Sequence, residues 1–402
     1  MRDRWIRRQK VFLPIQNQFK IDRILNVAKK KLLIVGAFPP SSKRIFGGII
    51  SSCRALLQSS LSEKVELTLV DSTQISNPPP VLIIKIILAI KRMVLFVIRF
   101  ERVKPNAVLL FASAGGSLFE KGLMSHYARI RGARSLMFPR GGRILHYCDE
   151  IGLENLLARF ALSKPDRIVC QGEQWQEFVV SKLKRSIEVA PLIRNWTATP
   201  QLLSIGANRV FSAEVLEIRM IFVGWMDRAK GVMDLLVAFS RLPTEVQLRL
   251  EIIGEGDVSE EARDYVVTHS LSERVIFRGW LAGDDLLDAY RSADIFVLPS
   301  WFEGLPNAMI EAMAARIAVI VSNVGNIPGV VVDDESGLLV PPKDLDALEM
   351  AMRRVLVDAE LRKRLANSAY CVAGRQFGVE LAVDKIIDVL DGLQEEQSSG
   401  SF

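Results

Sequence analysis

Two carboxylates, Glu303 and Glu311, stand eight positions apart in A-D-I-F-V-L-P-S-W-F-E-G-L-P-N-A-M-I-E-A-M-A-A-R, residues 293–316. The apolar run 295–298 predicts a strand buried on both faces of a parallel sheet. Residues 308–315 are mostly strong helix formers. Glu303 is therefore expected on the loop that joins strand to helix, and Glu311 on the first turns of the helix. The unpaired backbone N–H groups at such a helix start attract phosphate.

This arrangement suits a ligand that has a phosphate in its middle and hydroxyl groups at both ends. The helix start would hold the phosphate, and the two carboxylates would accept hydrogen bonds from the hydroxyls. A nucleotide sugar has that shape. The alternative is an ordinary strand–helix unit with two solvated glutamates, because a Glu-x7-Glu spacing alone is common.

The wider stretch S-W-F-E-G-L-P-N-A-M-I-E-A-M-A resembles the signature of the retaining family-four glycosyltransferases, which have the GT-B fold. The resemblance implies an α/β chain with two Rossmann-like, doubly wound parallel-sheet domains that face each other across a cleft. In that family the second glutamate binds the ribose of the donor, and the first lies against the donor sugar. It thus implies Glu311 as a ribose ligand and Glu303 as a catalytic residue. Gly304, Leu305 and Asn307 of the same motif are then expected to bind the donor.

The length of the chain, 402 residues, is too great for one ordinary core and suits two domains of roughly 200 residues each. We predict a basic N-terminal extension at 1–30 and an acceptor domain at 31–205. A donor domain follows at 214–375, and a helix at 376–394 is expected to cross back to the first domain.

The charge is divided unevenly between the two halves. Residues 1–200 contain 33 Lys and Arg against 14 Asp and Glu, a net of +19, whereas the remainder has a net of −13. Such asymmetry indicates that the basic half binds an anionic partner. No basic helix-turn-helix, zinc knuckle or aromatic-studded basic strand is present, so we expect no nucleic acid. An anionic membrane surface or a diphosphate-bearing acceptor fits better.

Two segments of the first half bear on membrane contact. Residues 1–30 hold nine Lys or Arg; they are either a disordered tail or a surface segment that touches lipid through Trp5, Ile6, Val11 and Phe12. Residues 81–102 form an apolar helix that carries a basic stripe and is too interrupted to span a bilayer. It is either a core helix with one wet face or an in-plane membrane helix. No signal peptide is evident, so we expect a cytoplasmic protein, peripheral on the inner face of the membrane.

The first domain offers two candidate phosphate contacts. Strands are predicted at 31–38, 106–111, 135–138, 167–170 and 187–190. Gly47 and Gly48, between the first strand and a helix, would let the backbone approach an oxyanion, although a plain tight turn is the alternative. Arg140 ends the third of these strands where many relatives carry His-Gly. An arginine there can bind a diphosphate through two hydrogen bonds but cannot act as a base. We therefore predict that Arg140 has a catalytic, electrostatic role; the alternative is a structural Gly-Gly turn with a solvated arginine.

The second domain offers further cations. Strands are predicted at 220–224, 247–254, 274–279, 295–298 and 317–321. Lys230, followed by glycine, matches the family's diphosphate-binding Lys-Gly. Trp225 stands where the family has arginine, and Arg228 is the expected substitute. Arg278 resembles the position that holds the nucleotide base, with a surface role as the alternative.

The segment after the last predicted strand implies that Gly325 and Asn326 reach the donor through backbone N–H groups. Asp333 and Asp334 could suggest a metal pair, but they lie in a turn-like setting and are read as a solvated loop. No Asp-x-Asp is present, and the four cysteines and three histidines have no metal-ligand spacing. We therefore expect neither a metal nor a cofactor, and a nucleoside diphosphate sugar as co-substrate.

The function implied by the resemblance is transfer of a sugar, with retention, to a saccharide or lipid-linked saccharide in surface polysaccharide or lipopolysaccharide synthesis. Two alternatives remain open. One is a catalytically silent binding partner of the same fold, suggested by Trp225 and Arg140 at two family positions. The other is a nucleotide-sugar epimerase on the same scaffold.

Overall fold

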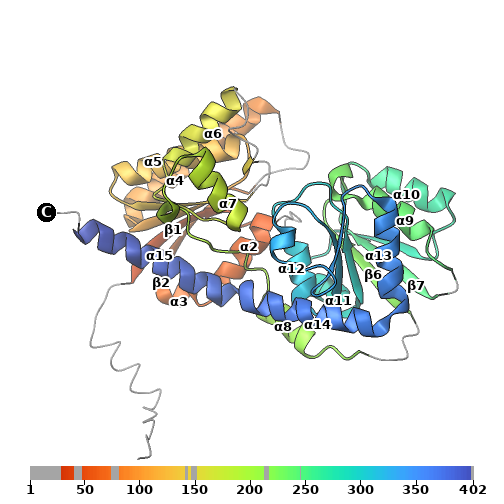
Figure 1. Cartoon of the computed structure of the whole chain (residues 1–402). Coiled ribbons are helices and arrows are strands. Elements are labelled where there is room, and N and C mark those ends of the chain that lie inside the picture. Colours follow the sequence, from red (N-terminus) through yellow and green to blue (C-terminus); the bar gives the residue numbers. More distant parts are fainter. Residues whose placement is uncertain are drawn as a thin grey trace, which may run out of the picture.

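The computed structural model describes residues 29–39, 48–73, 81–140, 144–145, 152–211, 217–244 and 246–399. Gly47 and nearly all of the basic N-terminal extension lie outside these residues. The described chain forms two parallel sheets, one in each half of the molecule, with helices on both faces of each (Figure 1). The predicted fold class, two doubly wound Rossmann-like units, is confirmed.

The first sheet has five strands in the order β2-β1-β3-β4-β5. All its pairings are parallel. The strands are β1 (Lys30–Gly36), β2 (Val65–Asp71), β3 (Ala107–Ala112), β4 (Arg134–Pro139) and β5 (Arg167–Ile168). The strand order reverses between β1 and β3, so their carboxyl ends frame a crevice in which ligands of such sheets bind.

The second sheet has six strands in the order β11-β10-β9-β6-β7-β8. They are β6 (Ile218–Val223), β7 (Leu248–Ile253), β8 (Val275–Gly279), β9 (Ile295–Leu298), β10 (Ala318–Ser322) and β11 (Leu338–Val340). Here the order reverses between β6 and β9. Strand β9 is buried on both faces, as its continuous apolar sequence predicts.

The helices connect these strands. In the first half they are α2 (Gly48–Leu57), α3 (Leu61–Lys64), α4 (Leu82–Val103), α5 (Gly116–Ile130), α6 (Leu153–Ser163) and α7 (Glu173–Glu177). Helix α8 (Pro200–Ala207) follows where the chain crosses over, and it packs in the core of the second half. In the second half they are α9 (Val232–Ser240), α10 (Ser259–Thr268), α11 (Asp284–Ser292), α12 (Asn307–Ala314), α13 (Leu345–Val357), α14 (Ala359–Gln376) and α15 (Val379–Ser399). Short turns of other helix types lie at Phe178–Lys182, Ile187–Val189, Arg228–Lys230 and Ile327–Gly329.

One predicted strand is wrong. Residues 187–190 were expected to close the first sheet, but Ile187–Val189 is a short 3-10 helix. The side chain of Ile187 is exposed, whereas Ile193, a few residues later, is fully buried. Beyond β5, a single parallel bridge between Cys170 and Leu192 extends the edge of the sheet in place of the predicted strand. Burial has overridden the β-propensity of the isoleucine and valine.

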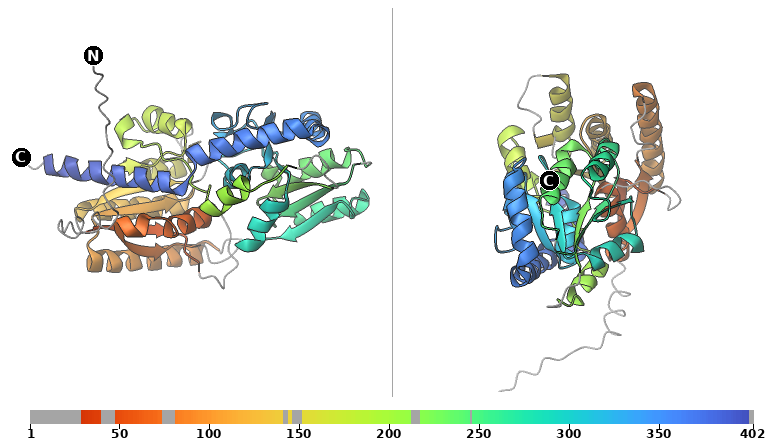
Figure 2. Two further views of the ribbon diagram at one scale, coloured as in Figure 1. Left: turned by 90° about the horizontal axis from the view of Figure 1, so that it is seen from below. Right: turned by 90° about the vertical axis from the view of Figure 1, so that its right-hand side faces the viewer.

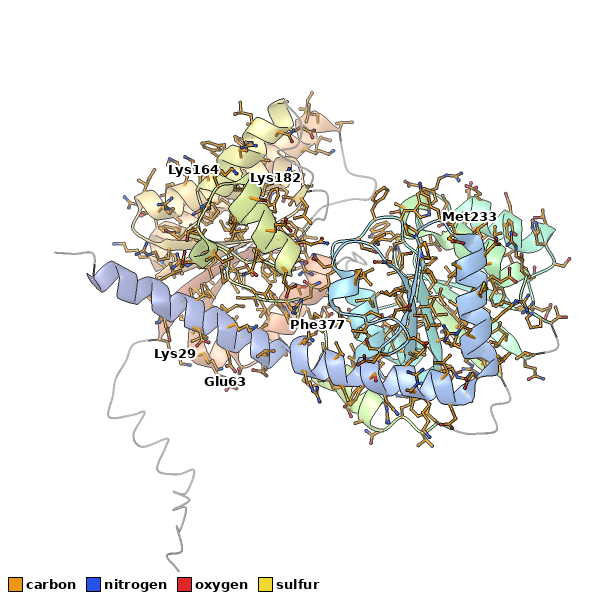
Figure 3. All side chains as sticks on the ribbon, in the orientation of Figure 1. Lys29, Glu63, Lys164, Lys182, Met233 and Phe377 are labelled. Carbon is orange, nitrogen blue, oxygen red and sulfur yellow. The ribbon has the colours of Figure 1, made fainter. Side chains whose placement is uncertain are left out.

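The two halves are tied together where the chain crosses between them. Helix α14 runs along the second half and helix α15 along the first, and Phe377 lies at their junction (Figure 3). The Phe377 carbonyl accepts a hydrogen bond from the Ala198 N–H at 3.1 Å. Helix α15 buries Val383, Ile386 and Leu390 among the residues of β1 and β3. Helix α15 thus packs on the first sheet, as the views of Figure 2 show.

Candidate active site

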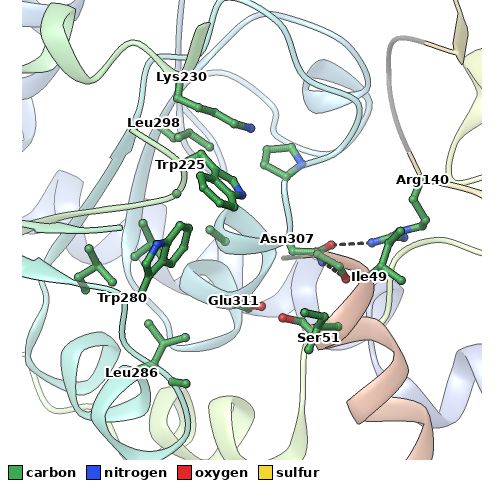
Figure 4. Close-up of a pocket in the computed structure, with 18 of the residues that line it drawn as sticks. Ile49, Ser51, Arg140, Trp225, Lys230, Trp280, Leu286, Leu298, Asn307 and Glu311 are labelled. Atoms are coloured by element: carbon green, nitrogen blue, oxygen red, sulfur yellow. Dashed lines mark hydrogen bonds between the residues drawn. The ribbon is translucent and has the colours of Figure 1, made fainter. Parts of the chain in front are cut away.

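A cleft of about 370 Å³ lies between the two halves, at the carboxyl ends of both sheets. This volume is in the range of small-molecule sites. The first half contributes residues of α2 and those that follow β3, β4 and β5; the second half contributes those that follow β6, β8 and β9 and the start of α12 (Figure 4). Predicted site residues that line the cleft are Gly48, Arg140, Lys230, Glu303, Leu305, Asn307 and Glu311.

Glu303 and Lys230 form an ion pair on the second-half wall of the cleft. The Lys230 ammonium donates to Glu303 Oε1 at 2.5 Å, and the Ser300 hydroxyl donates to the same oxygen at 3.0 Å. The Glu303 side chain is only 8% exposed, whereas Lys230 retains 24% exposure. The lysine is thus held at the cleft by a carboxylate that is itself fixed, and its charge can still reach an incoming anion.

Two glycines allow the loops of this ion pair to lie close to other backbone. Gly231, next to Lys230, has a φ of +71°, and a Cβ there would lie 2.1 Å from the Pro299 carbonyl oxygen. Gly325 has a φ of +58°, and its Cβ would lie 2.1 Å from the Glu303 carbonyl oxygen. Only glycine fits both requirements. Gly325 thereby supports the Glu303 loop from behind, together with the Asn326 N–H, which donates to the Gly304 carbonyl at 2.8 Å.

Glu311, on α12, also lines the cleft. Its Oε2 accepts a hydrogen bond from the Tyr290 hydroxyl at 2.8 Å. Burial raises the pKa of Glu311 from 4.5 to about 7, because the protein replaces much of the water that would solvate the charge. The hydrogen bond from Tyr290 opposes this shift. Near neutral pH, Glu311 is therefore divided between its acid and its carboxylate form.

Arg140 joins the two halves at the start of α12. Its guanidinium donates to Asn307 Oδ1 and to the Ser52 hydroxyl, both at 3.1 Å, and also to Asn195. The Asn195 amide donates to Leu305 O and Asn307 Oδ1, both at 2.9 Å. Burial lowers the pKa of Arg140 to about 10, so the group stays charged at neutral pH. A fixed positive charge thus stands beside the helix start.

Several predicted residues lie outside the cleft lining. Arg228 is 64% exposed and pairs with Glu261 at 2.8 Å, and Arg278 pairs with Glu251 at 3.4 Å. Gly325 and Asn326 lie behind the Glu303 loop, and Gly304 belongs to that loop. Asp334 pairs with Arg354 at 3.0 Å on the surface. Within the described part of the chain, no three His, Cys, Asp or Glu side chains gather as metal ligands would.

The structure adds cleft residues that sequence reasoning did not assign. Trp225 and Trp280 meet edge to face, with ring centroids 4.8 Å apart, on the apolar side of the cleft. Trp280 directly follows β8, a position at a carboxyl end that could have indicated a ligand contact. Arg54, on α2, adds a cation from the first half. Asn195 lies in the segment that leaves the first half, where no local pattern marks it.

Residues 211–371 match the family model described as glycosyl transferases group 1. The match lies within the second half and spans 161 of the 402 residues of the chain. The match includes Lys230, Glu303 and Glu311, the three residues that the structure gathers on one wall of the cleft. The predicted resemblance to the retaining family-four glycosyltransferases is confirmed.

Known proteins extend this comparison. O-antigen chain mannosyltransferase B of Escherichia coli is 31% identical over 174 residues, which are 42% of this chain and 44% of that protein. The match spans less than half the length of the first curated relatives. Sucrose-phosphate synthase of Thermosynechococcus elongatus superposes with a TM-score of 0.74 and 19% identity, over 92% of this chain and 100% of that chain. Anabaena HepE, solved with UDP-glucose, superposes with a TM-score of 0.64 and 15% identity, over 90% of this chain and 99% of that chain. These structures share the GT-B fold.

Proposed function

We propose that the chain transfers a sugar, with retention of configuration, from a nucleoside diphosphate sugar to an acceptor hydroxyl. The observation that carries the proposal is the convergence of Glu303, Lys230, Glu311 and the start of α12 on one cleft. The diphosphate lies over the α12 N-terminus, where unpaired N–H groups and the helix dipole favour negative charge. Lys230 from the second half and Arg140 from the first flank it.

Glu311 accepts hydrogen bonds from the ribose, and Glu303 contacts the donor sugar. Beyond the ribose, the apolar side of the cleft with Trp225 and Trp280 suits the flat face of a nucleobase. Family membership, Glu303 beside a lysine, and the UDP-glucose that HepE binds all support a sugar nucleotide as donor.

The reaction breaks the bond between the anomeric carbon and the diphosphate oxygen while the acceptor oxygen bonds to the same face of the sugar. The departing phosphate takes the proton of the acceptor hydroxyl, so no side chain has to act as general base. Lys230 and Arg140 stabilise the negative charge that develops on the diphosphate. No metal is required in this scheme, because the two cations and the helix start supply the positive field. Glu303 favours positive charge on the sugar ring.

The acceptor is a saccharide or a lipid-linked saccharide of a cell-surface polysaccharide or lipopolysaccharide, handled on the cytoplasmic side. Support comes from the relatives, among them an O-antigen mannosyltransferase and a lipopolysaccharide core glycosyltransferase. The basic first half, which forms the acceptor side of the cleft in this proposal, is suited to an anionic acceptor.

A thermal-stability screen of nucleotide sugars tests the donor. One nucleoside diphosphate sugar should raise the melting temperature, since a ligand that binds only the folded state stabilises it by mass action. The increase should shrink in Lys230→Gln and remain in Lys363→Gln, a surface lysine on α14. If no nucleotide sugar stabilises the protein, the proposal fails.

Incubating the bound donor without acceptor separates the alternatives. A transferase should hydrolyse it slowly to free sugar, and Glu303→Ala should abolish this. Binding with no turnover would indicate a silent binding partner of the same fold. Conversion of the donor to an epimer, with the diphosphate bond intact, would indicate an epimerase.

A further inference from the structure

Helix α4 (Leu82–Val103) carries most of the exposed apolar surface of the first half. Only Phe96 and Phe100 of this helix are buried. Nine apolar residues around it are 43% to 71% exposed: Val81, Leu82, Ile83, Ile84, Ile86, Ile87, Ile90, Val94 and Ile98. A contiguous patch of this kind differs from single exposed apolar residues, which are common, and marks an interaction surface.

The exposed side chains form a continuous stripe. Ile83, Ile87, Ile90, Val94 and Ile98 follow one another at intervals of three or four positions, so they share one face of the helix. We call these five residues the apolar stripe. They extend from Ile83 to Ile98 on a helix of 22 residues, which is about 33 Å long at about 1.5 Å per residue.

A different face of α4 fixes the helix to the protein. The rings of Phe96 and Phe100 contact the Tyr127 ring of α5, with centroids 6.1 Å and 5.5 Å away. Arg92 donates two hydrogen bonds to Glu120, at 2.8 and 2.7 Å. The helix is thus anchored through its buried side, and it lies at the edge of the molecule (Figure 2, right-hand view) with the apolar stripe exposed.

Cations border the apolar stripe. Lys91 lies four positions after Ile87, and Arg102 lies four positions after Ile98; both side chains are exposed. Residues at this spacing are neighbours on a helix surface. The half of the chain that contains α4 has a net charge of +19. The surface therefore combines an apolar stripe with flanking positive charges. The apolar stripe complements the acyl chains of an anionic lipid surface, and the positive charges complement its phosphates.

A spanning role is excluded for this helix, since no described helix is long and apolar enough to cross a bilayer. We propose that α4 lies in the plane of an anionic membrane surface. The apolar stripe enters the acyl-chain boundary, and Lys91 and Arg102 contact lipid phosphates. None of the cleft-lining residues belongs to α4, so this surface is separate from the candidate active site and its test does not depend on the donor.

Sedimentation of the full-length protein with vesicles tests the proposal. Vesicles that contain about one third phosphatidylglycerol should bind the protein at low salt, and vesicles of phosphatidylcholine alone should bind it much more weakly. Binding should fall as salt rises, because salt screens the cations. Equal binding to both vesicle types, or none to either, overturns the proposal.

Paired variants locate the contact. Ile83→Ser with Ile87→Ser should weaken vesicle binding on the order of 100-fold, because two isoleucines lose their burial in lipid. Lys91→Gln with Arg102→Gln should weaken it by roughly fivefold per charge. The matched control is Val267→Ser with Val357→Ser, two valines of the second half that are 69% and 75% exposed. Loss of binding in the control equal to that in the α4 pair would overturn the proposal.

An environment-sensitive fluorophore distinguishes lipid from a protein occupant of the same surface. It is attached to Ile87→Cys in a Cys371→Ser background, since Cys371 is exposed, with Val267→Cys as the control position. The α4 label should shift to the blue only when anionic vesicles are added. A blue-shifted label before vesicles are added, or a dimer in sedimentation velocity that Ile83→Ser with Ile87→Ser dissociates, would show that protein covers the stripe and would overturn the proposal.

Discussion

The two halves of the molecule have the same architecture but contribute different kinds of residues to the cleft. Each is a doubly wound parallel sheet whose carboxyl ends face the other. The second half, with a net charge of −13, supplies both glutamates and Lys230 and carries the family match. The first half, with a net charge of +19, supplies Arg140 and Arg54 and carries the exposed α4.

In the proposed function, this difference divides donor binding and catalysis between the two halves. Lys230 and Glu303 follow the neighbouring strands β6 and β9 of one sheet, and Glu311 lies on α12, so the second half supplies most of the proposed donor site. The first half adds Arg140 to the start of α12 through contacts that exist only when the halves meet. We therefore expect second-half changes to affect chemistry or donor affinity directly, and first-half changes to act through the contacts between the halves.

The largest effect is expected from Glu303→Gln. Removing the carboxylate beside the sugar should lower the transfer rate by about 1000-fold, the upper range for loss of one transition-state interaction. Donor affinity should not fall, because the variant also frees Lys230 from its 2.5 Å ion pair. Rates and binding are measured separately, by single-turnover kinetics and calorimetry. A Glu360→Gln variant, altered on the surface, should behave as wild type; retention of more than a tenth of the rate by Glu303→Gln would refute its role.

A smaller effect is expected from Arg140→Gln on the first half. The loss of a charged hydrogen-bonding group next to the diphosphate should reduce the rate roughly tenfold to a hundredfold. Binding of free nucleoside diphosphate should change less, since the second half holds most of it. Arg129→Gln, another first-half arginine that does not line the cleft, is the control. An equal loss of nucleotide affinity and rate would mean that the halves share donor binding, and the division drawn above would be wrong.

The smallest effect is a pH dependence that arises from Glu311. Its pKa of about 7 means that near neutral pH only part of the protein carries the carboxylate to which the proposed function assigns the ribose. Donor affinity should therefore rise by about tenfold between pH 6 and pH 8, as calorimetry at several pH values would show. Glu311→Gln should abolish the rise. Tyr290→Phe should shift it to higher pH, because the hydrogen bond that lowers the pKa is lost.

The same group affects folding with a defined sign. A carboxyl whose pKa is raised in the folded state holds its proton more tightly there than in the unfolded chain. Its contribution to stability is thus largest below pH 4.5 and decreases as the pH rises from 4.5 to about 7. The Glu311→Gln variant should lack this decrease in a comparison of denaturation midpoints. An unchanged midpoint profile would indicate an ordinary pKa.

The sequence predicted the second half in most respects that concern the site. Continuous apolar runs such as residues 295–298 identified strands buried on both faces, and the residues after them necessarily lie at the carboxyl edge of a parallel sheet. The positions of Glu303 and Lys230 in the cleft followed from this rule. It did not extend to Arg228 and Arg278, which pair with Glu261 and with the buried Glu251, because the position of a carboxylate within reach of each arginine depends on side-chain packing.

What the sequence determined by itself was the pair of doubly wound sheets, the loop that bears Glu303 and the uneven charge of the halves, since strand burial, turn residues and composition are local properties. Tertiary structure alone decided that Arg140 meets Asn307, 167 positions away, and that Gly325 supports the Glu303 loop from behind. It also decided that the apolar stripe of α4 is exposed. In the same way it decided that the chain is buried at Ile193 and not at Ile187, where the strand was predicted. Contacts between distant segments depend on how whole elements pack, and no local pattern of residues specifies that geometry.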